Sequence, residues 1–258
     1  MPLLSIITIN FNNAEGLKKT IESVISQSFN DFEYIIIDGG STDVSAEIIK
    51  QNNRINYWIS EKDKGIYDAM NKGILKSSGN YLLFLNSGDY LCENVLEKVF
   101  SETHTEDILY GNMKINWGGN NITDGIMPNK ITLEHMVKDT LWHPVSFIKK
   151  ELFNKFGLYN TDYEIVADYE FFFKNIIINK SSNVHLNYFI TEYNVEGFSS
   201  LPSNKVKEKA ERLKVIKTYL SNEELNNINY LLVEKKETLF MRVFKRFKKI
   251  IESNGYKS

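Results

Sequence analysis

Residues 3–10 read Leu-Leu-Ser-Ile-Ile-Thr-Ile-Asn, an apolar and largely β-branched run that is too short for a helix. A run of this kind predicts a buried strand, here over 3–9. Similar short apolar runs recur along the first part of the chain, and they predict further strands at 32–37, 55–59 and 81–85.

Helical segments are expected between these strands, because apolar residues recur there every three or four positions. Asn12 or Asn13 can cap the first helix, residues 41–43 offer caps for the second, and the third spans 66–75. The resulting β-α-β-α-β-α-β order predicts an α/β fold. Its central sheet should be mostly parallel and Rossmann-like, with helices on both faces.

The periodicity loosens from Asp107 onward, where shorter elements follow one another. Strands are expected at 108–110, 113–117, 145–148 and 184–193, and helices at 151–156 and 167–178. Past Pro202 the chain is rich in Lys and Glu, and its pattern predicts helix to the end. We therefore expect one domain over 1–200, with halves 1–105 and 106–200, and an α-helical C-terminal extension over 201–258.

The composition of the 258-residue chain narrows the classes of protein to consider. Its formal net charge of -2 does not favour nucleic acid as the main partner. Cys92 is the single cysteine, so no intramolecular disulfide can form, and a lone thiol suits a reducing compartment. The sequence has neither a signal peptide nor an apolar run of about 20 residues, so a cytoplasmic protein is expected.

Polar residues follow each of the four N-terminal strands. In an open parallel sheet, ligands bind beyond the carboxyl ends of the strands. The segments at these ends are Thr8-Ile9-Asn10, Asp38-Gly39-Gly40, Glu61-Lys62-Asp63 and Asn86-Ser87-Gly88-Asp89. One such segment alone is typical of a turn followed by a helix cap, but four in succession predict a binding site.

The phosphate-binding loops of common nucleotide-binding folds are absent from the first hundred residues, which contain neither G-x-G-x-x-G nor G-x-x-x-x-G-K-[ST]. A diphosphate at this edge would therefore need a metal ion. Asp89, with Asn86 three residues before it, offers the oxygen ligands that Mg²⁺ or Mn²⁺ prefers. Asp89 could equally cap the helix that follows. His104, His135 and His185 lack ligand-like spacing, so a zinc site is not expected.

Several longer motifs match a known family. They are Ser5-Ile6-Ile7-Thr8-Ile9-Asn10-Phe11-Asn12, Gln27-Ser28-Phe29, Ile37-Asp38-Gly39-Gly40-Ser41-Thr42-Asp43, Asp63-Lys64-Gly65-Ile66-Tyr67-Asp68-Ala69-Met70-Asn71-Lys72-Gly73 and Phe84-Leu85-Asn86-Ser87-Gly88-Asp89. In this order they resemble the family-2 glycosyltransferases of GT-A fold, and in particular the branch that builds bacterial O-antigen and capsule polysaccharides. The resemblance extends from about residue 3 to residue 200.

The resemblance implies that the first half of the chain binds a nucleotide sugar. The residues that would contact its base, ribose or diphosphate are Thr8, Asn10, Asp38, Asp68 and Asn71. The first three belong to the ends of the first two strands and would meet the base and ribose. Asp68 and Asn71 lie about one helical turn apart on a single face, and they would meet the ribose or the sugar diphosphate.

Residues 86–89 occupy the place of the family's metal-binding D-x-D motif. The resemblance implies that Asn86 and Ser87 face the nucleotide sugar and that Asp89 binds the metal, Mg²⁺ or Mn²⁺. Asn86 and Gly88 depart from the family pattern. Asp89 is therefore the only carboxylate of the motif.

The second half of the chain resembles the acceptor half of the family. Residues 165–172 are similar to the segment that carries the catalytic base, which takes the proton of the acceptor hydroxyl. The residues alone leave Asp168 and Glu170 open as bases, or as helix caps, and the resemblance favours Asp168. His143 would orient the acceptor or contact a phosphate, although a histidine beside Trp142 and Pro144 is also typical of a packed residue.

The resemblance, together with the polar segments at the strand ends, predicts an inverting hexosyl- or N-acetylhexosaminyltransferase of polysaccharide biosynthesis. Its donor would be a nucleoside-diphosphate sugar, with UDP favoured, and its acceptor a lipid-linked saccharide at the inner face of the membrane. A nucleotidyltransferase would need a glycine-rich, basic diphosphate loop, which is absent. A nucleotide-sugar-binding module without catalytic activity is the alternative, because the metal motif is altered.

The end of the chain predicts an amphipathic helix. Between Leu239 and Ile251, apolar residues fall at spacings of three and four, and basic residues lie largely on the other side. Such a helix can lie on an anionic membrane surface, which would make the protein a peripheral membrane protein. It can also dock on the domain itself or on a second subunit of a homodimer, and the sequence leaves these occupants open.

Overall fold

The computed structural model describes residues 1–118, 121–194, 204–228 and 231. The strands in these ranges are β1 (Leu4–Asn10), β2 (Phe32–Asp38), β3 (Tyr57–Ser60), β4 (Tyr81–Phe84), β5 (Tyr90–Leu91), β6 (Ile108–Asn116), β7 (Ile122–Gly125), β8 (Ser146–Lys149) and β9 (Asn183–Asn194). The helices are α1 (Ala14–Ile25), α2 (Ser45–Lys50), α3 (Ile66–Lys76), α4 (Val95–Val99), α5 (Leu133–Lys138), α6 (Lys150–Phe156), α7 (Ala167–Phe172) and α8 (Lys205–Tyr219), with the 3₁₀ turn η1 (His143–Val145) and the π-helical turn η2 (Phe173–Ile178).

The N-terminal half confirms the predicted alternation of strands and helices. β3, β2, β1 and β4 lie side by side and are all parallel, with Asn10 and Asp38 directly opposite each other at the carboxyl ends of β1 and β2. Asn13 caps α1 through a bond from the Gly16 amide at 3.1 Å, while Asp43 accepts from the Ser45 amide at the start of α2. The predicted site segments thus meet at one edge of the sheet.

The second half adds strands of mixed direction, which the expectation of a mostly parallel sheet did not include. β8 is antiparallel to both β4 and β6, β9 is parallel to β6, and β5 and β7 are antiparallel additions to β9 and β6. The strands expected at 108–110 and 113–117 are one strand, β6, whose pairing with β9 is irregular between Tyr110 and Asn112. Gly111 lies in this irregular stretch, where an added Cβ would come within 2.5 Å of the Ile190 side chain.

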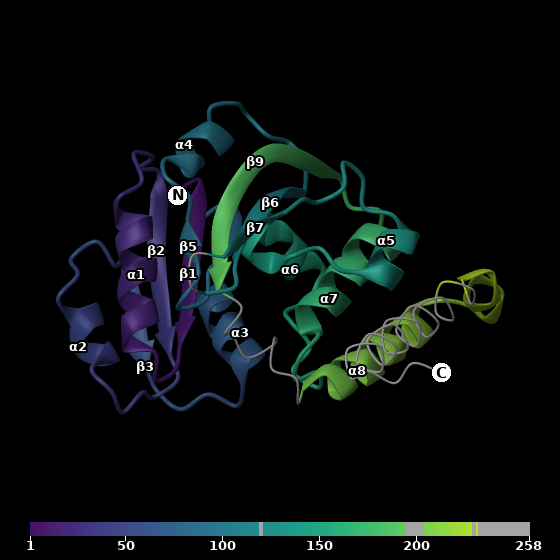
Figure 1. The fold of residues 1–258 in the computed structure, drawn as a ribbon, viewed down its shortest axis with the longest axis horizontal. Coiled ribbons are helices and arrows are strands. Elements are labelled where there is room, and N and C mark those ends of the chain that lie inside the picture. Colours follow the sequence, from purple (N-terminus) through teal and green to yellow (C-terminus); the bar gives the residue numbers. More distant parts are fainter. Residues whose placement is uncertain (119–120, 195–203, 229–230, 232–258) are drawn as a thin grey trace, which may run out of the picture.

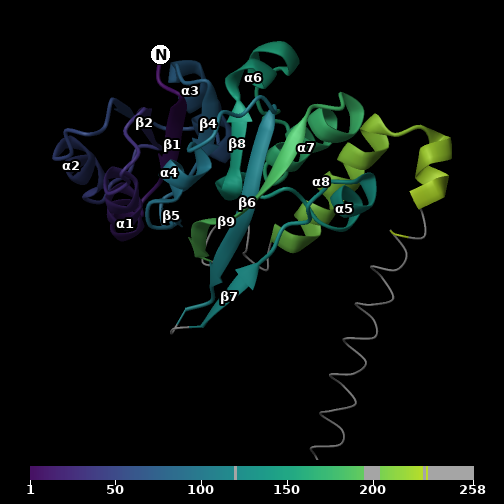
Figure 2. The ribbon, with the colours of Figure 1, turned by 90° about the horizontal axis from the view of Figure 1, so that it is seen from above.

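Helices cover both faces of the sheet, as predicted. One buried cluster lies between the sheet and α1, α2 and α4, and the other lies between the sheet and α3, α5, α6, α7 and α8. Seen from above, α1 and α3 stand on opposite sides of β1 (Figure 2). Phe171, Phe172 and Phe173 are completely buried in the second cluster, which supports their interpretation as core residues.

The C-terminal part of the described chain is helical, as expected. Val215 and Ile216 of α8 are buried in the same cluster as α7, and α8 lies beside α7 and α5 in Figure 1. The predicted amphipathic helix at 239–251 lies outside the described residues. Within the described ranges, no helix is both long and apolar enough to span a bilayer. The division of the chain at residue 200 stays a prediction.

Candidate active site

A hydrogen-bonded cluster of polar side chains closes the carboxyl ends of β1 and β2. The Asn10 amide nitrogen donates to Asp38 Oδ1 at 2.7 Å, and the Ser41 hydroxyl donates to the same oxygen at 2.6 Å. Asp38 Oδ2 accepts from the Ser41 amide at 2.9 Å and from the Ser60 hydroxyl at 2.5 Å. Burial favours the neutral form of Asp38, but these four bonds hold the pKa of its carboxyl below the usual value. Asp38 is therefore a buried, fixed carboxylate.

The same cluster contains an acceptor without a partner. Asn10 is 4% exposed, and its amide nitrogen is held by Asp38 and Ser41. Its Oδ1 is buried and has no hydrogen-bond partner among the residues that the structure describes. An unsatisfied buried acceptor is costly, so this atom is a point where a ligand N–H or O–H group would be stabilised. Thr8 lies two residues before Asn10 on the same strand, fully buried, with its hydroxyl 3.1 Å from that of Tyr34. Its side chain has no exposed surface here.

Phe11 is a residue that the sequence analysis did not select. It follows Asn10 directly, and the residue is 65% exposed although its ring lies beside Gly39, just after β2. A large apolar side chain in the open, next to buried polar groups, is a surface on which a flat aromatic ligand can stack. Its place in the sequence, immediately after a strand end, was the signal that could have identified it.

Lys72 joins the third strand end to α3. Its ammonium group pairs with Asp63 at 2.5 Å, Glu61 at 2.8 Å and Asp68 at 3.6 Å. Asp68 also accepts a hydrogen bond from the Lys64 amide at 3.0 Å, which holds its carboxylate at the start of α3. The predicted neighbour of Asp68, Asn71, faces another way.

The Asn71 side chain is hydrogen-bonded to the backbone of Tyr159. Its amide nitrogen donates to the Tyr159 carbonyl at 2.9 Å, and its Oδ1 accepts from the Tyr159 amide at 3.0 Å. The side chain therefore ties α3 to the acceptor half of the protein. A contact between Asn71 and a nucleotide sugar stays a prediction.

The segment after β4 brings Asn86, Ser87 and Asp89 to the same edge. The Ser87 amide donates to the carbonyl of Ile9 at 3.1 Å, which places this segment beside the end of β1. Asp89 is 4% exposed, and its Oδ1 accepts from the Asn194 amide at the end of β9, at 3.1 Å. Burial raises the pKa of Asp89 to about 7, although the Asn194 bond and the nearby His143 act in the opposite direction.

The donor set at this segment fits a divalent cation. Among the described residues, Asn86 Oδ1 is buried without a hydrogen-bond partner, and Asp89 is a buried carboxyl whose Oδ1 accepts from the Asn194 amide. Both are oxygen ligands of the type that Mg²⁺ and Mn²⁺ prefer. Within the described residues, no three side chains of His, Cys, Asp or Glu form a group that could hold a metal ion.

Asp168 is held at the start of α7 by two side chains from elsewhere in the chain. His143 Nδ1 lies 3.2 Å from Asp168 Oδ2, and the Tyr67 hydroxyl lies 2.7 Å from Oδ1. His143 Nε2 lies 3.3 Å from the amide nitrogen of Asn86, so a chain of contacts links Asn86, His143, Asp168 and Tyr67. We call these four residues the Asp168 relay. Asp168 keeps 16% of its side chain exposed, which leaves it open to a ligand.

The relay lowers the pKa of Asp168. Nδ1 of His143 faces the Asp168 carboxylate and donates its proton to it, while Nε2 lies beside the Asn86 amide nitrogen. Burial alone would raise the pKa of Asp168, but the hydrogen bond and charge of His143, together with the Tyr67 hydroxyl, hold that pKa below its usual value. Asp168 is thus an ionised carboxylate at the rim of the site.

Glu170 points in a different direction from Asp168. It is 4% exposed, and its carboxylate accepts a hydrogen bond from Tyr219 of α8. Residues two apart on a helix do not face the same side, which explains why the two acids separate. Of the predicted acceptor-side residues, the structure brings His143 to Asp168 and leaves Glu170 outside the relay.

Comparison with known proteins identifies the family. The model described as "Glycosyl transferase family 2" matches residues 5–173. The uncharacterized glycosyltransferase Rv1514c of Mycobacterium tuberculosis (strain H37Rv) is 34% identical over 187 residues, which are 69% of this chain and 70% of that protein. A PGL/p-HBAD biosynthesis glycosyltransferase of Mycobacterium bovis (strain BCG / Pasteur) is 33% identical over 183 residues, 66% of this chain and 68% of that protein.

Solved structures share the fold. The crystal structure of S. aureus TarS 1-349 in complex with UDP matches with a TM-score of 0.62 at 18% identity, over 74% of this chain and 60% of that one. The mannosyltransferase PcManGT from Pyrobaculum calidifontis, in complex with GDP-Man and Mn²⁺, matches with a TM-score of 0.67 at 13% identity, over 89% of this chain and 68% of that one. This chain therefore belongs to glycosyl transferase family 2, and it is a glycosyltransferase of GT-A fold.

Proposed function

We propose that the protein is an inverting glycosyltransferase that moves a hexose or N-acetylhexosamine from a nucleoside-diphosphate sugar to an acceptor hydroxyl. The observation that carries this proposal is the Asp168 relay, an ionised carboxylate held from two sides at the rim of the sheet edge. Transfer with inversion needs one carboxylate that removes the acceptor's proton, on the face opposite to the leaving diphosphate. We assign this role to Asp168, because Glu170 is already bonded to Tyr219.

The nucleoside is assigned to the ends of β1 and β2. There the unpaired Oδ1 of Asn10 would accept an N–H or O–H group, the Asp38 carboxylate would face the base or ribose, and Phe11 would stack on the base. Asp68 would reach the ribose from the start of α3. A UDP-linked sugar is favoured because TarS binds UDP and UDP-GlcNAc, while PcManGT shows that a GDP-linked donor also suits this fold.

The proposed reaction is a direct displacement at the anomeric carbon of the donor sugar. The acceptor oxygen forms a bond to the anomeric carbon as the bond from that carbon to the diphosphate oxygen breaks, and the acceptor's proton passes to Asp168. Asn86, Ser87 and Asp89 would lie toward the diphosphate. A bound Mg²⁺ or Mn²⁺, held by Asp89 and Asn86, would neutralise the charge of the departing diphosphate. His143 and Tyr67 would keep Asp168 oriented throughout.

We assign the acceptor to the lipid-linked saccharides of surface-polysaccharide synthesis, of the O-antigen or capsule type. This assignment is supported by the biosynthetic role in the name of the M. bovis relative, and it rests further on the basic, apolar C-terminal segment. The rival function is a nucleotide-sugar-binding module without catalysis, which the Asn86 substitution in the metal motif favours.

Binding and turnover separate these two functions. Thermal stabilisation by UDP-, GDP- and dTDP-sugars with Mn²⁺ would identify the donor, because a ligand that binds only the folded state raises Tm. Release of the nucleoside diphosphate from the best donor, with water as the fallback acceptor, would then be measured in wild type. We expect turnover that depends on Asp168. Stabilisation by a donor without any turnover would establish the binding module instead.

A further inference from the structure

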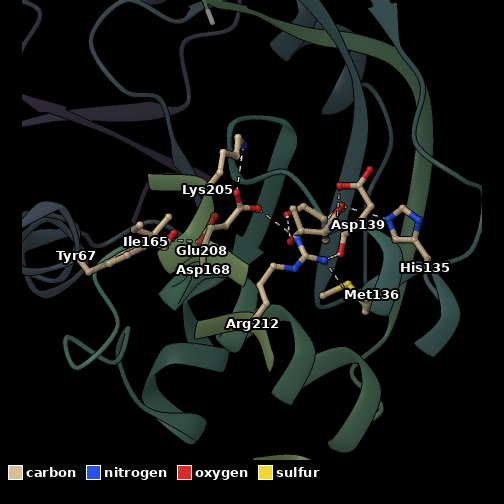
Figure 3. A network of polar contacts seen from close by, with 11 residues as sticks. Tyr67, His135, Met136, Asp139, Ile165, Asp168, Lys205, Glu208 and Arg212 are labelled. Carbon is tan, nitrogen blue, oxygen red and sulfur yellow. Dashed lines mark hydrogen bonds and ion pairs between the residues drawn. The ribbon is translucent and has the colours of Figure 1, made fainter. Parts of the chain in front are cut away.

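Helix α8 packs against the segment that carries Asp168. Val215 and Ile216 of α8 are buried with the aromatic residues of α7 and η2, and Phe173 lies 6.2 Å from the ring of Tyr219. In Figure 3, Arg212 of α8 reaches toward Met136 and Asp139, while Tyr67 lies toward Ile165 and Asp168. The contacts below concern residues 164–170, which contain the Asp168 carboxylate and end on α7.

Glu211 of α8 binds the backbone just before α7. One carboxylate oxygen of Glu211 accepts from the Glu164 amide at 3.1 Å, and the other accepts from the Ile165 amide at 3.0 Å. Hydrogen bonds from backbone amides to a carboxylate are among the stronger ones in proteins. Two of them, one on each oxygen, restrict both the position and the orientation of residues 164 and 165.

Ile165 connects this clamp to the base. The hydroxyl of Tyr67 lies 2.7 Å from the Ile165 carbonyl and 2.7 Å from Asp168 Oδ1. A tyrosine hydroxyl has a single proton, so these two acceptors share it or take it in turn. The position of the Ile165 carbonyl therefore influences how much of the Tyr67 hydrogen bond reaches Asp168.

Other α8 residues hold the chain after Asp168. The Arg212 guanidinium lies 4.3 Å from the centre of the Tyr169 ring and donates to the carbonyls of Met136, at 3.2 Å, and Asp139. Tyr219 donates to Glu170. Asp168 is thus flanked on both sides by residues that contact α8, although it touches none of these α8 side chains through a hydrogen bond of its own.

We infer that Glu211 is a positioning residue for Asp168, which acts through Ile165 and Tyr67 and makes α8 part of the catalytic apparatus. This inference rests on the proposed function, because it concerns the base of that reaction. The Glu211 carboxylate would set the orientation of Asp168 toward the acceptor hydroxyl, and it would leave the binding of the nucleotide sugar untouched. The nucleotide cluster lies at the ends of β1 and β2, whereas Glu211 contacts the acceptor half.

Glu211→Gln tests the inference and has a matched control on the same helix. The glutamine retains one acceptor oxygen, but its amide group faces a backbone N–H, so one of the two clamp bonds is lost. Glu208→Gln removes the same charge one helical turn earlier, where the side chain pairs with Lys205 and Arg212 of its own helix. Release of UDP from UDP-N-acetylglucosamine, or of GDP from GDP-mannose, gives the rate for whichever donor the wild type accepts.

We expect Glu211→Gln to lower kcat about 10- to 100-fold, as small misplacements of catalytic groups do, with the donor Kd changed less than twofold. Glu208→Gln should retain at least half of the wild-type kcat. In an Asp168→Asn background, Glu211→Gln should lower the residual rate no further, since a residue that acts through Asp168 has no effect once that carboxylate is gone. A full additional loss in that background would overturn the positioning role.

A measurement without turnover separates this inference from the proposed function. Hydrogen exchange of the amides of Glu164 and Ile165 should become faster in Glu211→Gln and remain unchanged in Glu208→Gln. Unchanged exchange in Glu211→Gln, or wild-type kcat in that variant, overturns the inference even when the wild type is active. A wild type that binds a donor and never releases the nucleoside diphosphate overturns the proposed function, and the positioning role of Glu211 falls with it.

Discussion

His143 Nδ1 lies 3.2 Å from Oδ2 of Asp168, while its other ring nitrogen faces the amide of Asn86 at 3.3 Å. One imidazole therefore connects the altered metal motif to the proposed base. The two ends of this contact have different chemical consequences. The bond to Asp168 stabilises the ionised carboxylate, and the contact with Asn86 leaves the oxygen of that amide free for another ligand.

The role of His143 can be tested with two amide substitutions. The nitrogen of an asparagine side chain occupies nearly the position of Nδ1, whereas that of glutamine lies nearer to Nε2. We expect His143→Gln to lower turnover about 10- to 100-fold and His143→Asn to lower it less, because only asparagine retains the donor to Asp168. Loss of that donor should also raise the pKa of Asp168, so the acidic limb of the pH–rate profile should move to higher pH. Equal rates for the two variants would contradict a donor role for Nδ1.

Asp168→Asn should abolish transfer and leave the binding of the nucleotide sugar intact. The change removes the proton acceptor and retains the shape of the side chain, and loss of a general base costs on the order of 10² to 10⁴ in rate. Donor affinity is measured by calorimetry and turnover by nucleoside-diphosphate release. Glu170→Gln is the matched control, because Glu170 bonds to Tyr219 outside the relay. Near wild-type turnover in Asp168→Asn, with loss in Glu170→Gln, would transfer the role of base to Glu170.

The parts of this fold that sequence could predict are those with long buried runs. All seven residues of β1 are buried, and the apolar runs of β2 and β4 are equally plain. The missed elements are short or exposed. β5 has two residues, α4 has five, α5 has six, and three of the four residues of β7 are exposed, so none has a hydrophobic period long enough to recognise.

Some residues of the candidate site could likewise be paired from the sequence, and others could not. Asn10 and Asp38 could be paired in advance, since both end adjacent parallel strands and the rule for such sheets places ligands there. The contacts of the Asp168 relay could not be predicted from the sequence. Tyr67 and Asp168 are 101 residues apart, and they meet only after α3 and α7 pack on the same face of the sheet. The contacts of Glu211 with Glu164 and Ile165 are equally remote in sequence, and no local pattern indicates them.

Asp89 should make stability depend on pH in the absence of metal. Its pKa is about 7 in the folded protein, against an ordinary value of 3.8, so between these values the folded state retains a proton that the unfolded state has lost. The stabilising effect of that proton is complete below about pH 4 and is lost as the pH rises to about 7. Asp89→Asn, which cannot ionise, should therefore be more stable than wild type at pH 8, by on the order of 2 kcal/mol, and not at pH 4.

Thermal or urea unfolding at the two pH values measures this difference. Addition of Mn²⁺ with the nucleoside diphosphate should reverse the order at pH 8, because the ligand stabilises only a site that retains the carboxylate. A wild-type advantage at pH 8 without any metal would show that Asp89 is not a buried, uncompensated charge.

Gly73 permits the close packing of α3 on β1. A Cβ at this position would lie 2.4 Å from Cγ2 of Ile7, a buried and branched side chain that has little freedom to move. Gly73→Ala gains up to about 1 kcal/mol of helix propensity, while overpacking costs typically 1 to 3 kcal/mol. We expect a net loss of about 1 kcal/mol in the free energy of unfolding, measured in urea. Leu75→Ala, at a position that is 70% exposed on the same helix, should change it by less than about 0.5 kcal/mol.

The C-terminal segment should bind anionic membranes. Residues 239–251 lie outside the described residues, so the expectation comes from their sequence alone, in which apolar residues at spacings of three and four accompany five basic residues, Arg242, Lys245, Arg246, Lys248 and Lys249. Each basic residue near an anionic surface contributes about 1 kcal/mol, and the apolar residues enter the headgroup layer. A lipid-linked acceptor would then share one surface with the enzyme.

Sedimentation with lipid vesicles tests this expectation. The full chain should sediment with vesicles that contain anionic lipid, less so in high salt, and a chain that ends at Lys236 should remain in the supernatant. A full-length variant with Phe244→Ser and Phe247→Ser retains all five charges and should bind more weakly, because the apolar face is reduced. If the full and shortened chains sediment equally, the segment packs on protein, on this subunit or a second copy, and the membrane role is wrong.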